Sequence, residues 1–344
     1  MLGGHLETTS QSLGAGQEAR ILKAFITGIA GFAGSHLAEF LLTQPNLEVA
    51  GLVHDRSDNV AHLRERAVLH RGDLLDPASI LAVLQAIQPD VIFHLAGQSF
   101  VPSSWHDPWL TFESNVRGQL NLLEAVAQVA PEIRVLVVGS NEEYGLVLPN
   151  QLPVNEDTPM RPDSPYGVSK IAQDLMGLQY HLSKGLATIR VRPFNHIGPR
   201  QSERFVAAAL ARQIAEIEVG LRPPVLAVGN LQAQRDFTDV RDTVRAYHLV
   251  LEHGVPGEVY NIGSGVPHSI QELLGILLEL AHVEVGVEVD RTRLRPSDVP
   301  LSYCDASRLF ACTGWQPLIP FAQGLKDTLD YWRTRVREGV DRQA

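Results

Sequence analysis

Short apolar runs alternate with amphipathic stretches along the first part of the chain. Runs of strand length lie at residues 21–27, 47–53, 67–73, 90–96, 133–140 and 187–194. Helical periodicity fills the intervals that end at residue 42, that span residues 77–87 and 108–129, and that include Lys170. Buried strands separated by such helices indicate a parallel sheet covered on both faces. The pattern predicts an α/β, doubly wound, Rossmann-type fold.

After Phe194 the alternation becomes less regular. Helices are expected at residues 205–219, 241–253, 270–282 and from 321 onward, with strands at 257–264 and 283–290. We interpret residues 21–194 as a dinucleotide-binding domain to which segments near 225–263 return, and residues 195–340 mainly as a smaller substrate lobe. Residues 1–20 are polar and without period, which predicts a disordered leader.

Composition limits the classes of protein to consider. Apolar residues make up 44% and charged residues 20% of the 344 residues, as in ordinary globular proteins. A net charge of -10 argues against a nucleic-acid partner. No apolar run is long enough for a membrane span, and Cys304 and Cys312 have no metal-type spacing. The sequence therefore predicts a cytoplasmic protein with reduced thiols, no metal and no membrane contact.

The first apolar run leads directly into a glycine-rich turn. Gly28 permits a tight turn, Gly31 lets backbone approach a pyrophosphate, and Gly34 lets the following helix pack closely on the strand. Phe32 and Ala33 complete this turn at the amino end of the helix, where an anion is held well. Because a strand precedes the turn and an amphipathic helix follows, the turn predicts a dinucleotide site.

The end of the second strand bears on which dinucleotide binds. An acidic residue at the tip would bind the 2′-hydroxyl of NAD, but the tip falls at Val53 and His54, with Arg56 close behind. These residues favour the 2′-phosphate of NADP(H). Asp55 would instead repel a 2′-phosphate, so NAD(H) remains possible as the cofactor.

The third and fourth strands end in further candidate cofactor contacts. Asp73, followed by Leu74, ends the third strand where an adenine amino group could be met, although Asp73 could equally cap the helix from Pro77. Mostly small residues end the fourth strand and leave room on the ribose side of the cofactor: Leu95, Ala96 and Gly97.

The chemistry centres on Tyr166 and Lys170. Their spacing of four residues on a helix that opens at Pro165 places both side chains on one face. The pKa of a free phenol is about 10, and a neighbouring ammonium is expected to lower that pKa. Ser140 ends the fifth strand, at the sheet edge where ligands bind, and its hydroxyl can bond the same substrate oxygen. The alternative is a surface tyrosine, an extended lysine and a serine that only ends a strand.

Three motifs resemble the extended short-chain dehydrogenase/reductases that act on nucleotide sugars. They are TGIAGFAGSHL, GSNEEYG and SPYGVSK, and the similarity extends from Ile21 to Arg333. The resemblance implies that Ser140, Tyr166 and Lys170 form the catalytic triad, with tyrosine as acid/base and lysine also holding the nicotinamide ribose.

The second half is similar to the GDP-4-keto-6-deoxy-D-mannose reductases. The segments RPFNHIGPRQSERFV, VGNLQAQRDFTDVRD and LRPSDVPLSYCDASRLFACTGWQP carry this resemblance. It implies reduction of the C4 ketone of GDP-4-keto-6-deoxy-D-mannose to GDP-D-rhamnose. It also implies residues that contact the nucleotide diphosphate and ribose: Asn195, Arg235, Arg295 and Asp298. Arginine suits a diphosphate, although Arg235 and Arg295 could instead form surface ion pairs with Asp239 and Asp298.

Two other functions stay open. Glu142 stands where the related sugar-nucleotide 4,6-dehydratases carry a catalytic glutamate, so dehydration of GDP-mannose, or epimerisation, is the main alternative. A non-catalytic dinucleotide sensor is the second. The helices at residues 108–129 and 169–184 are apolar around much of their circumference, including Leu120 and Leu175, which predicts a homodimer packed through them.

Overall fold

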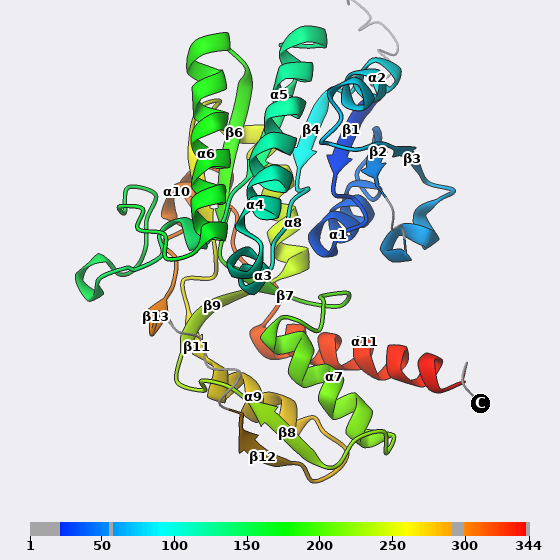
Figure 1. The fold of residues 1–344 in the computed structure, drawn as a ribbon, viewed down its shortest axis with the longest axis vertical. Coiled ribbons are helices and arrows are strands. Elements are labelled where there is room, and N and C mark those ends of the chain that lie inside the picture. Colours follow the sequence, from blue (N-terminus) through cyan, green and yellow to red (C-terminus); the bar gives the residue numbers. More distant parts are fainter. Residues whose placement is uncertain (1–20, 55–57, 291–298, 342–344) are drawn as a thin grey trace, which may run out of the picture.

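The computed structural model describes residues 21–54, 58–290 and 299–341. Figure 1 shows a large sheet with helices on both faces and, below it, a smaller lobe that contains the carboxyl terminus. The predicted leader at residues 1–20 and the predicted site residues Arg56, Arg295 and Asp298 lie outside the described residues.

The large sheet has seven parallel strands in the order β10-β6-β5-β4-β1-β2-β3. Their bounds are β1 Leu22–Thr27, β2 Leu47–Val53, β3 Ala67–Arg71, β4 Val91–His94, β5 Arg134–Val138, β6 Ala187–Pro193 and β10 Val259–Ile262. The chain order reverses at β1, which has β2 on one side and β4 on the other. In such sheets a ligand binds at the carboxyl ends of the strands beside this reversal. The predicted Rossmann-type fold is confirmed.

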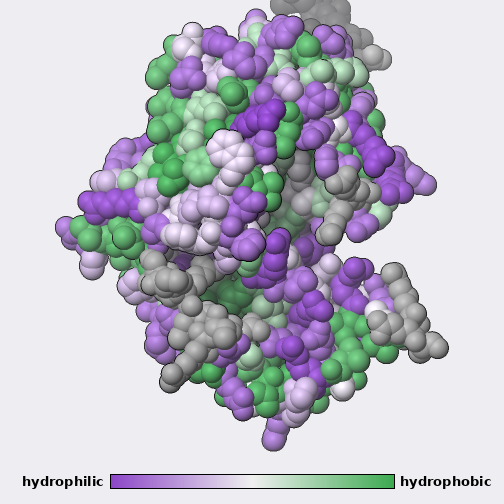
Figure 2. Space-filling model, in the orientation of Figure 1, coloured by the Kyte–Doolittle hydropathy of each residue, from purple (hydrophilic) through white to green (hydrophobic). Residues whose placement is uncertain are grey.

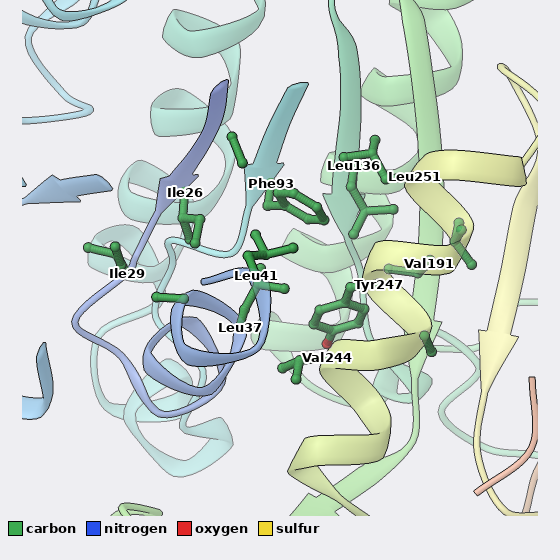
Figure 3. Close-up of a cluster of buried hydrophobic side chains, with 14 of the residues drawn as sticks. Ile26, Ile29, Leu37, Leu41, Phe93, Leu136, Val191, Val244, Tyr247 and Leu251 are labelled. Carbon is green, nitrogen blue, oxygen red and sulfur yellow. The ribbon is translucent and has the colours of Figure 1, made fainter. Parts of the chain in front are cut away.

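Helices cover both faces of this sheet, and successive residues of each strand point to opposite faces. Ala24 and Ile26 of β1 pack in one core with α1 (Phe32–Leu41) and α8 (Val240–His253), which Figure 3 shows in part. Phe25, between them, packs in the other core. That core lies under three helices: α2 (Pro77–Ile87), α5 (Gly118–Val129) and α6 (Pro165–Lys184).

Local sequence sets where α6 begins and ends. Ser164 caps its amino end by accepting a hydrogen bond of 3.0 Å from the Gly167 N–H, and Pro165 occupies the first turn, where its missing N–H costs nothing. Gly185 ends the helix with a φ of 71°. Tyr166 and Lys170 therefore lie in the first two turns, at the edge of the sheet where β5 ends.

The helix predicted over residues 108–129 is interrupted. It consists of α4 (Pro108–Phe112), a π-helical turn at Glu113–Arg117 and α5. Asn115 in this turn is fully buried and donates to the Gln98 carbonyl at 3.1 Å and to the Ser169 hydroxyl at 2.9 Å. The wider turn brings one amide side chain between the loop after β4 and helix α6. A short helix, α3 (Val101–His106), precedes α4.

The smaller lobe contains two small sheets and three helices. Strand β9 (Gln234–Asp239) pairs with β7 (Asn195–Ile197), β11 (Pro267–Ser269) and β13 (Leu301–Ser302), while β8 (Val225–Val228) pairs with β12 (Gly286–Val289). The helices are α7 (Val206–Glu218), α9 (Ile270–Glu279) and α11 (Phe321–Asp341). Of the segment at residues 225–263, α8 and β10 lie on the large sheet and β8 and β9 pair outside it. Helix α10 (Ser307–Thr313) packs on α8 and β10.

Residues 196–200, which we call the strap, join this lobe to α1. The His196 ring stacks on Phe32, with centroids 5.6 Å apart and planes 11° apart. His36 donates to the Pro199 carbonyl at 2.8 Å, and Arg200 forms a two-point ion pair with Glu39 at 2.7 and 2.6 Å. The three α1 side chains share one helix face, so the strap fixes the helix that follows the glycine-rich turn to the smaller lobe.

The Leu37→Ala substitution tests the core under α1 (Figure 3). Leu37 is fully buried. Removing its side chain leaves a cavity, so we expect the free energy of unfolding to fall by about 2 to 5 kcal/mol, measured by denaturant titration. Leu318→Ala, at a side chain 72% exposed, is the control and is expected to change little. Equal losses in the two variants would contradict this packing.

Candidate active site

The glycine-rich turn has no room for side chains. Gly28 has a φ of 75°, and a Cβ on it would lie 2.8 Å from the Ala96 backbone nitrogen. A Cβ on Gly34 would lie 2.1 Å from the Gly28 carbonyl oxygen. Gly31 caps α1 without any side-chain hydrogen bond, and the first turn of α1 has no acidic residue. The positive end of the helix is thus available to an anion, and the turn fits a cofactor pyrophosphate.

The predicted residues after β4 lie beside this turn. Leu95 donates its N–H to the Thr27 carbonyl at 3.2 Å, and a Cβ on Gly97 would lie 2.7 Å from Oδ1 of Asn115. Thr27 Oγ1 and His94 Nδ1 are 2.7 Å apart at the ends of β1 and β4. Burial, together with Lys170, lowers the pKa of His94 to about 3, so this histidine stays neutral.

His54 and Asp73 lie together at the tips of β2 and β3. His54 Nε2 is 3.7 Å from Asp73 Oδ2, and both side chains are largely exposed. Asp73 does not cap α2: Asp76 does so, and Asp73 instead accepts from the Leu75 N–H at 2.9 Å. The role of Asp73 as a helix cap, left open by the sequence, is therefore wrong.

Leu74 packs against α5. Its Cβ lies 3.3 Å from where a Cβ on Gly118 would sit, and its carbonyl accepts a hydrogen bond of 2.8 Å from Asn121. These contacts fix the loop between Asp73 and α2 on the face of the sheet that carries α5.

The fold brings Ser140, Tyr166 and Lys170 together. Each side chain is no more than 7% exposed. The Ser140 hydroxyl lies close enough to the Tyr166 phenol to lower its pKa, and the Lys170 ammonium lies 5.9 Å from the centroid of the Tyr166 ring. Lys170 also donates to the Val138 carbonyl at 2.9 Å, which ties α6 to the end of β5. A hydroxyl, a phenol and an amine thus meet beyond the strand ends, where proton transfer to a ligand is possible.

The charges around Tyr166 correct one expectation. Burial raises the pKa of Tyr166 well above its usual value; the Ser140 hydrogen bond opposes this, and Glu142 and Glu143 add to it. The expectation that Lys170 lowers this pKa is therefore wrong, because burial and two carboxylates dominate. Burial lowers the pKa of Lys170 to about 8, against the opposing effect of Glu143.

Glu142 lies close to this group, as the dehydratase alternative requires. It follows Ser140 in a 3-10 helix at Asn141–Glu143, and its N–H donates to the Ser140 hydroxyl at 3.2 Å. Its charge acts on Tyr166. The side chain of Glu142 is half-buried.

The sequence analysis missed a buried ionic network behind the triad. Its three members, each at most 2% exposed, are Glu143, Asp174 and Arg192. Arg192 forms an ion pair with each of the two acids. Burial and Asp174 raise the pKa of Glu143, while the Arg192 guanidinium opposes the rise and favours the carboxylate form. The Ser-x-x-Glu spacing of Ser140 and Glu143 is a capping-box signature that could have revealed the first link. Nothing in the sequence pattern reveals the long-range pairing with β6.

Asn195 and Arg235, which the resemblance assigns to substrate, lie in the smaller lobe. Asn195 begins β7, and its buried Oδ1 has no hydrogen-bond partner within the described structure. Arg235 donates to the Val299 carbonyl at 2.6 Å. Asp239, the ion-pair partner considered for Arg235, pairs with Arg241 at 2.8 Å. Figure 2 shows the surface hollowed between this lobe and the large sheet.

A protein-family model described as "GDP-mannose 4,6 dehydratase" matches residues 25–328. The chain belongs to this family. The resemblance to extended short-chain dehydrogenase/reductases of nucleotide sugars is thus confirmed.

Individual members of the GDP-mannose 4,6 dehydratase family and solved structures resemble the chain over most of its length. GDP-6-deoxy-D-mannose reductase of Pseudomonas aeruginosa is 38% identical over 92% of this chain and 99% of its own. GDP-mannose 4,6 dehydratase 1 of Arabidopsis thaliana is 34% identical over 89% of this chain and 88% of its own.

Among solved structures, RMD from Pseudomonas aeruginosa complexed with NADPH aligns with a TM-score of 0.81 and 38% identity, covering 91% of this chain and 99% of that one. UDP-glucose 4-epimerase of Thermus thermophilus in complex with NAD has a TM-score of 0.80 and 32% identity, covering the same shares.

The described residues contain neither a metal-binding group nor a membrane-spanning helix. Over residues 21–54, 58–290 and 299–341, no group of His, Cys, Asp and Glu side chains could hold a metal ion. No helix of this part of the chain is long and apolar enough to span a membrane.

The lowered pKa of Lys170 leads to a measurable titration. We expect the Lys170 ammonium to lose its proton as pH rises through about 8, since burial disfavours the charged form. Carbon NMR of lysine labelled at Cε should show one resonance with a midpoint near that pH, absent from a Lys170→Met variant. The absence of any lysine resonance titrating near pH 8 would contradict the burial of this amine.

Proposed function

We propose that this protein reduces the C4 ketone of GDP-4-keto-6-deoxy-D-mannose to GDP-D-rhamnose, with NADPH as the reductant. The observation that carries the proposal is that Ser140, Tyr166 and Lys170, all buried, meet at the strand ends next to the glycine-rich turn. The substrate class follows from family membership and from the reductase of Pseudomonas aeruginosa, 38% identical over 99% of its length.

The site residues have distinct roles in this reaction. Bound NADPH supplies the hydride for C4 of the sugar. Tyr166 donates its proton to the ketone oxygen, and Ser140 hydrogen-bonds the same oxygen and orients it. Lys170 holds the nicotinamide ribose. Neutralising the oxygen as it gains charge keeps a full negative charge from accumulating in a buried site.

The cofactor and the sugar nucleotide occupy different parts of the chain in this proposal. The turn that includes Gly31, Phe32 and Ala33 would hold the pyrophosphate of NADPH, and His54, together with Arg56 by its sequence position, would bind the 2′-phosphate of the cofactor. The complex of RMD with NADPH supports this cofactor, and the NAD complex of the epimerase leaves NADH as a weaker substitute. The diphosphate and ribose of the substrate are assigned by resemblance to residues of the smaller lobe: Asn195, Arg235, Arg295 and Asp298.

Dehydration of GDP-mannose is the alternative, and Glu142 is the residue that favours it. A carboxylate beside Tyr166 could remove the proton next to a C4 ketone and so eliminate water. Ser140 favours the reductase, since the resembling dehydratases usually carry threonine there. Intact Ser140, Tyr166 and Lys170 argue against a non-catalytic sensor. The free thiols of Cys304 and Cys312 suit a cytoplasmic enzyme.

Tyr166→Phe removes the proton donor and keeps the ring. With GDP-4-keto-6-deoxy-D-mannose, we expect the wild-type protein to consume NADPH and the variant to turn over about 10²- to 10⁴-fold more slowly. NADPH binding, measured by fluorescence titration, should stay close to that of the wild type. The assay follows absorbance of NADPH, with product analysis for GDP-D-rhamnose.

Two outcomes would overturn the reductase. One is dehydration of GDP-mannose by the wild-type protein without net change in NADPH. The other is an unchanged rate of reduction in Tyr166→Phe, which would place the chemistry elsewhere.

A homodimer completes the proposal. Apolar side chains face solvent on α5 and α6, including Leu120 at 40% and Leu175 at 48% exposure, and Figure 2 shows apolar residues over α6. Leu123, by contrast, is fully buried in the core under these helices. An exposed apolar face of this kind suits a second copy of the chain, because two such faces can bury each other.

Leu175→Glu tests the dimer by placing a charge on this face. We expect the wild-type protein to have the mass of two chains in solution, by light scattering, and the variant to have the mass of one. Val266→Glu, at a side chain 51% exposed in the smaller lobe, should stay dimeric. A wild-type protein with the mass of one chain would refute the dimer.

A further inference from the structure

Glu143, which has no part in the roles above, lies directly behind Ser140. Its side chain is fully buried in a space that exists because residue 139 is glycine, where a Cβ would lie 2.2 Å from Oε1 of Glu143. Oε1 accepts a hydrogen bond of 2.8 Å from the Ser140 N–H. The carboxylate thus holds the backbone of the residue whose hydroxyl meets the Tyr166 phenol.

The second carboxylate oxygen of Glu143 connects this loop to α6. Oε2 lies 2.9 Å from Nε of Arg192, a buried residue of β6. The same guanidinium donates to Asp174 at 3.0 and 3.2 Å, and Arg190 donates to Asp174 at 2.6 Å. Asp174 belongs to α6, the helix that carries Tyr166 and Lys170. One network therefore joins the Ser140 loop to the helix with the other two triad residues.

From this geometry we infer that Glu143 is a positioning residue for proton transfer, acting through Ser140. Linked by Arg192 to Asp174, it fixes the Ser140 loop against α6 and so keeps the serine hydroxyl on the phenol. The inference rests on the proposed function only in that Ser140 and Tyr166 must be the reacting pair. It adds a residue that does not itself touch the substrate.

A capping box alone would not explain the placement of Glu143. Such a glutamate needs only to reach the backbone N–H of the cap residue, which it can do from the protein surface. Burying a carboxylate is costly unless it is paired and hydrogen-bonded, and here Ser140 and Arg192 supply both partners from different elements. The cost is consistent with a requirement for fixed geometry at this point.

Glutamine at this position cannot keep both contacts. An amide has one acceptor oxygen and one donor NH₂, whereas Glu143 presents one oxygen to the Ser140 N–H and the other, as an ion pair, to the Arg192 guanidinium. In either orientation the amide of Glu143→Gln turns its NH₂ toward the Ser140 N–H or toward the cationic guanidinium of Arg192, and the ion pair is lost. The loop or the guanidinium must then shift, although the side chain keeps its size.

The test is a double-variant cycle with Ser140→Ala, Glu143→Gln and the combination, using NADPH consumption with the keto sugar. Ser140→Ala is expected to lower kcat by about 10²- to 10³-fold. Glu143→Gln should lower kcat by about 10- to 100-fold with little change in KM, since misplacement near 1 Å is enough for such a loss. In the Ser140→Ala background it should cost little more, because no hydroxyl remains to be positioned.

Glu156→Gln is the matched control. Glu156 is also a largely buried glutamate that accepts a backbone hydrogen bond, from Asn261 at 2.7 Å, but it does not contact Ser140. Its variant should lose thermal stability to a degree similar to Glu143→Gln and keep kcat. If Glu143→Gln keeps full kcat, or if its loss multiplies fully with that of Ser140→Ala, Glu143 is only structural and the inference is wrong.

Two further controls keep the outcome clear. Should Glu143→Gln not fold, Glu143→Leu combined with Arg192→Met replaces the ion pair by apolar side chains, which buried sites often tolerate. Its kcat should fall similarly, and full kcat would overturn the inference. A wild-type protein that reduces no keto sugar would refute the proposed function instead. The same cycle would then be measured on dehydration of GDP-mannose, for which the same serine and tyrosine are assigned.

Discussion

The close approach of two backbones, at Gly28 after β1 and Ala96 after β4, is the contact on which the site depends. A Cβ on Gly28 would lie 2.8 Å from the Ala96 nitrogen, and the φ of 75° at Gly28 suits glycine. The contact lets β1 turn directly into α1 over the end of β4. Because β4 lies between β1 and β5 in the sheet, β1 and β5 are about 10 Å apart at the usual spacing of about 4.8 Å between neighbouring strands. One extended ligand can therefore reach both the turn and Ser140.

The strap gives that turn a second fixed point. Phe32, His36 and Glu39 present one face of α1 to residues 196–200, through a ring stack, a hydrogen bond and a two-point ion pair. Arg200 has a φ of 71°, which is costly for a side chain and persists only where surrounding contacts fix it. Burial and Arg200 lower the pKa of His36 to about 4, so its ring stays neutral. Because Asn195 immediately precedes the strap, helix α1 and the first residue assigned to the substrate by resemblance belong to one connected unit.

Sequence periodicity was sufficient to predict the large sheet, because most of its strands are buried on both faces and so read as apolar runs, whereas the edge strand β3 is partly exposed. It was insufficient for β7, β11 and β13, whose lengths of three, three and two residues are too short for any period to show. The π-helical turn around Asn115 was also missed, since its wider winding follows from tertiary contacts with Gln98 and Ser169 rather than from local propensity.

Candidate site residues divide in the same way. The glycine turn and the spacing of Tyr166 and Lys170 are local signals, and the structure brings these residues to one edge of the sheet. The sign of the Tyr166 pKa shift is not a local signal. It depends on burial and on Glu142 and Glu143, which lie in another loop of the chain. A helical spacing can show that two groups are close, but it cannot show the surroundings that decide which charge is favoured.

The raised pKa of Tyr166 bears on the direction of the chemistry. A phenol that holds its proton at neutral pH is ready to act as an acid, which is what reduction of a ketone requires. It remains much more acidic than the alcohol that forms, so transfer is favourable once the ketone oxygen gains charge. Dehydration would begin with oxidation of a C4 hydroxyl, for which Tyr166 must first be a phenolate, the form that burial, Glu142 and Glu143 all disfavour. Glu142, the residue that suggests dehydration, is thus one of the groups that favour the protonated phenol used in reduction.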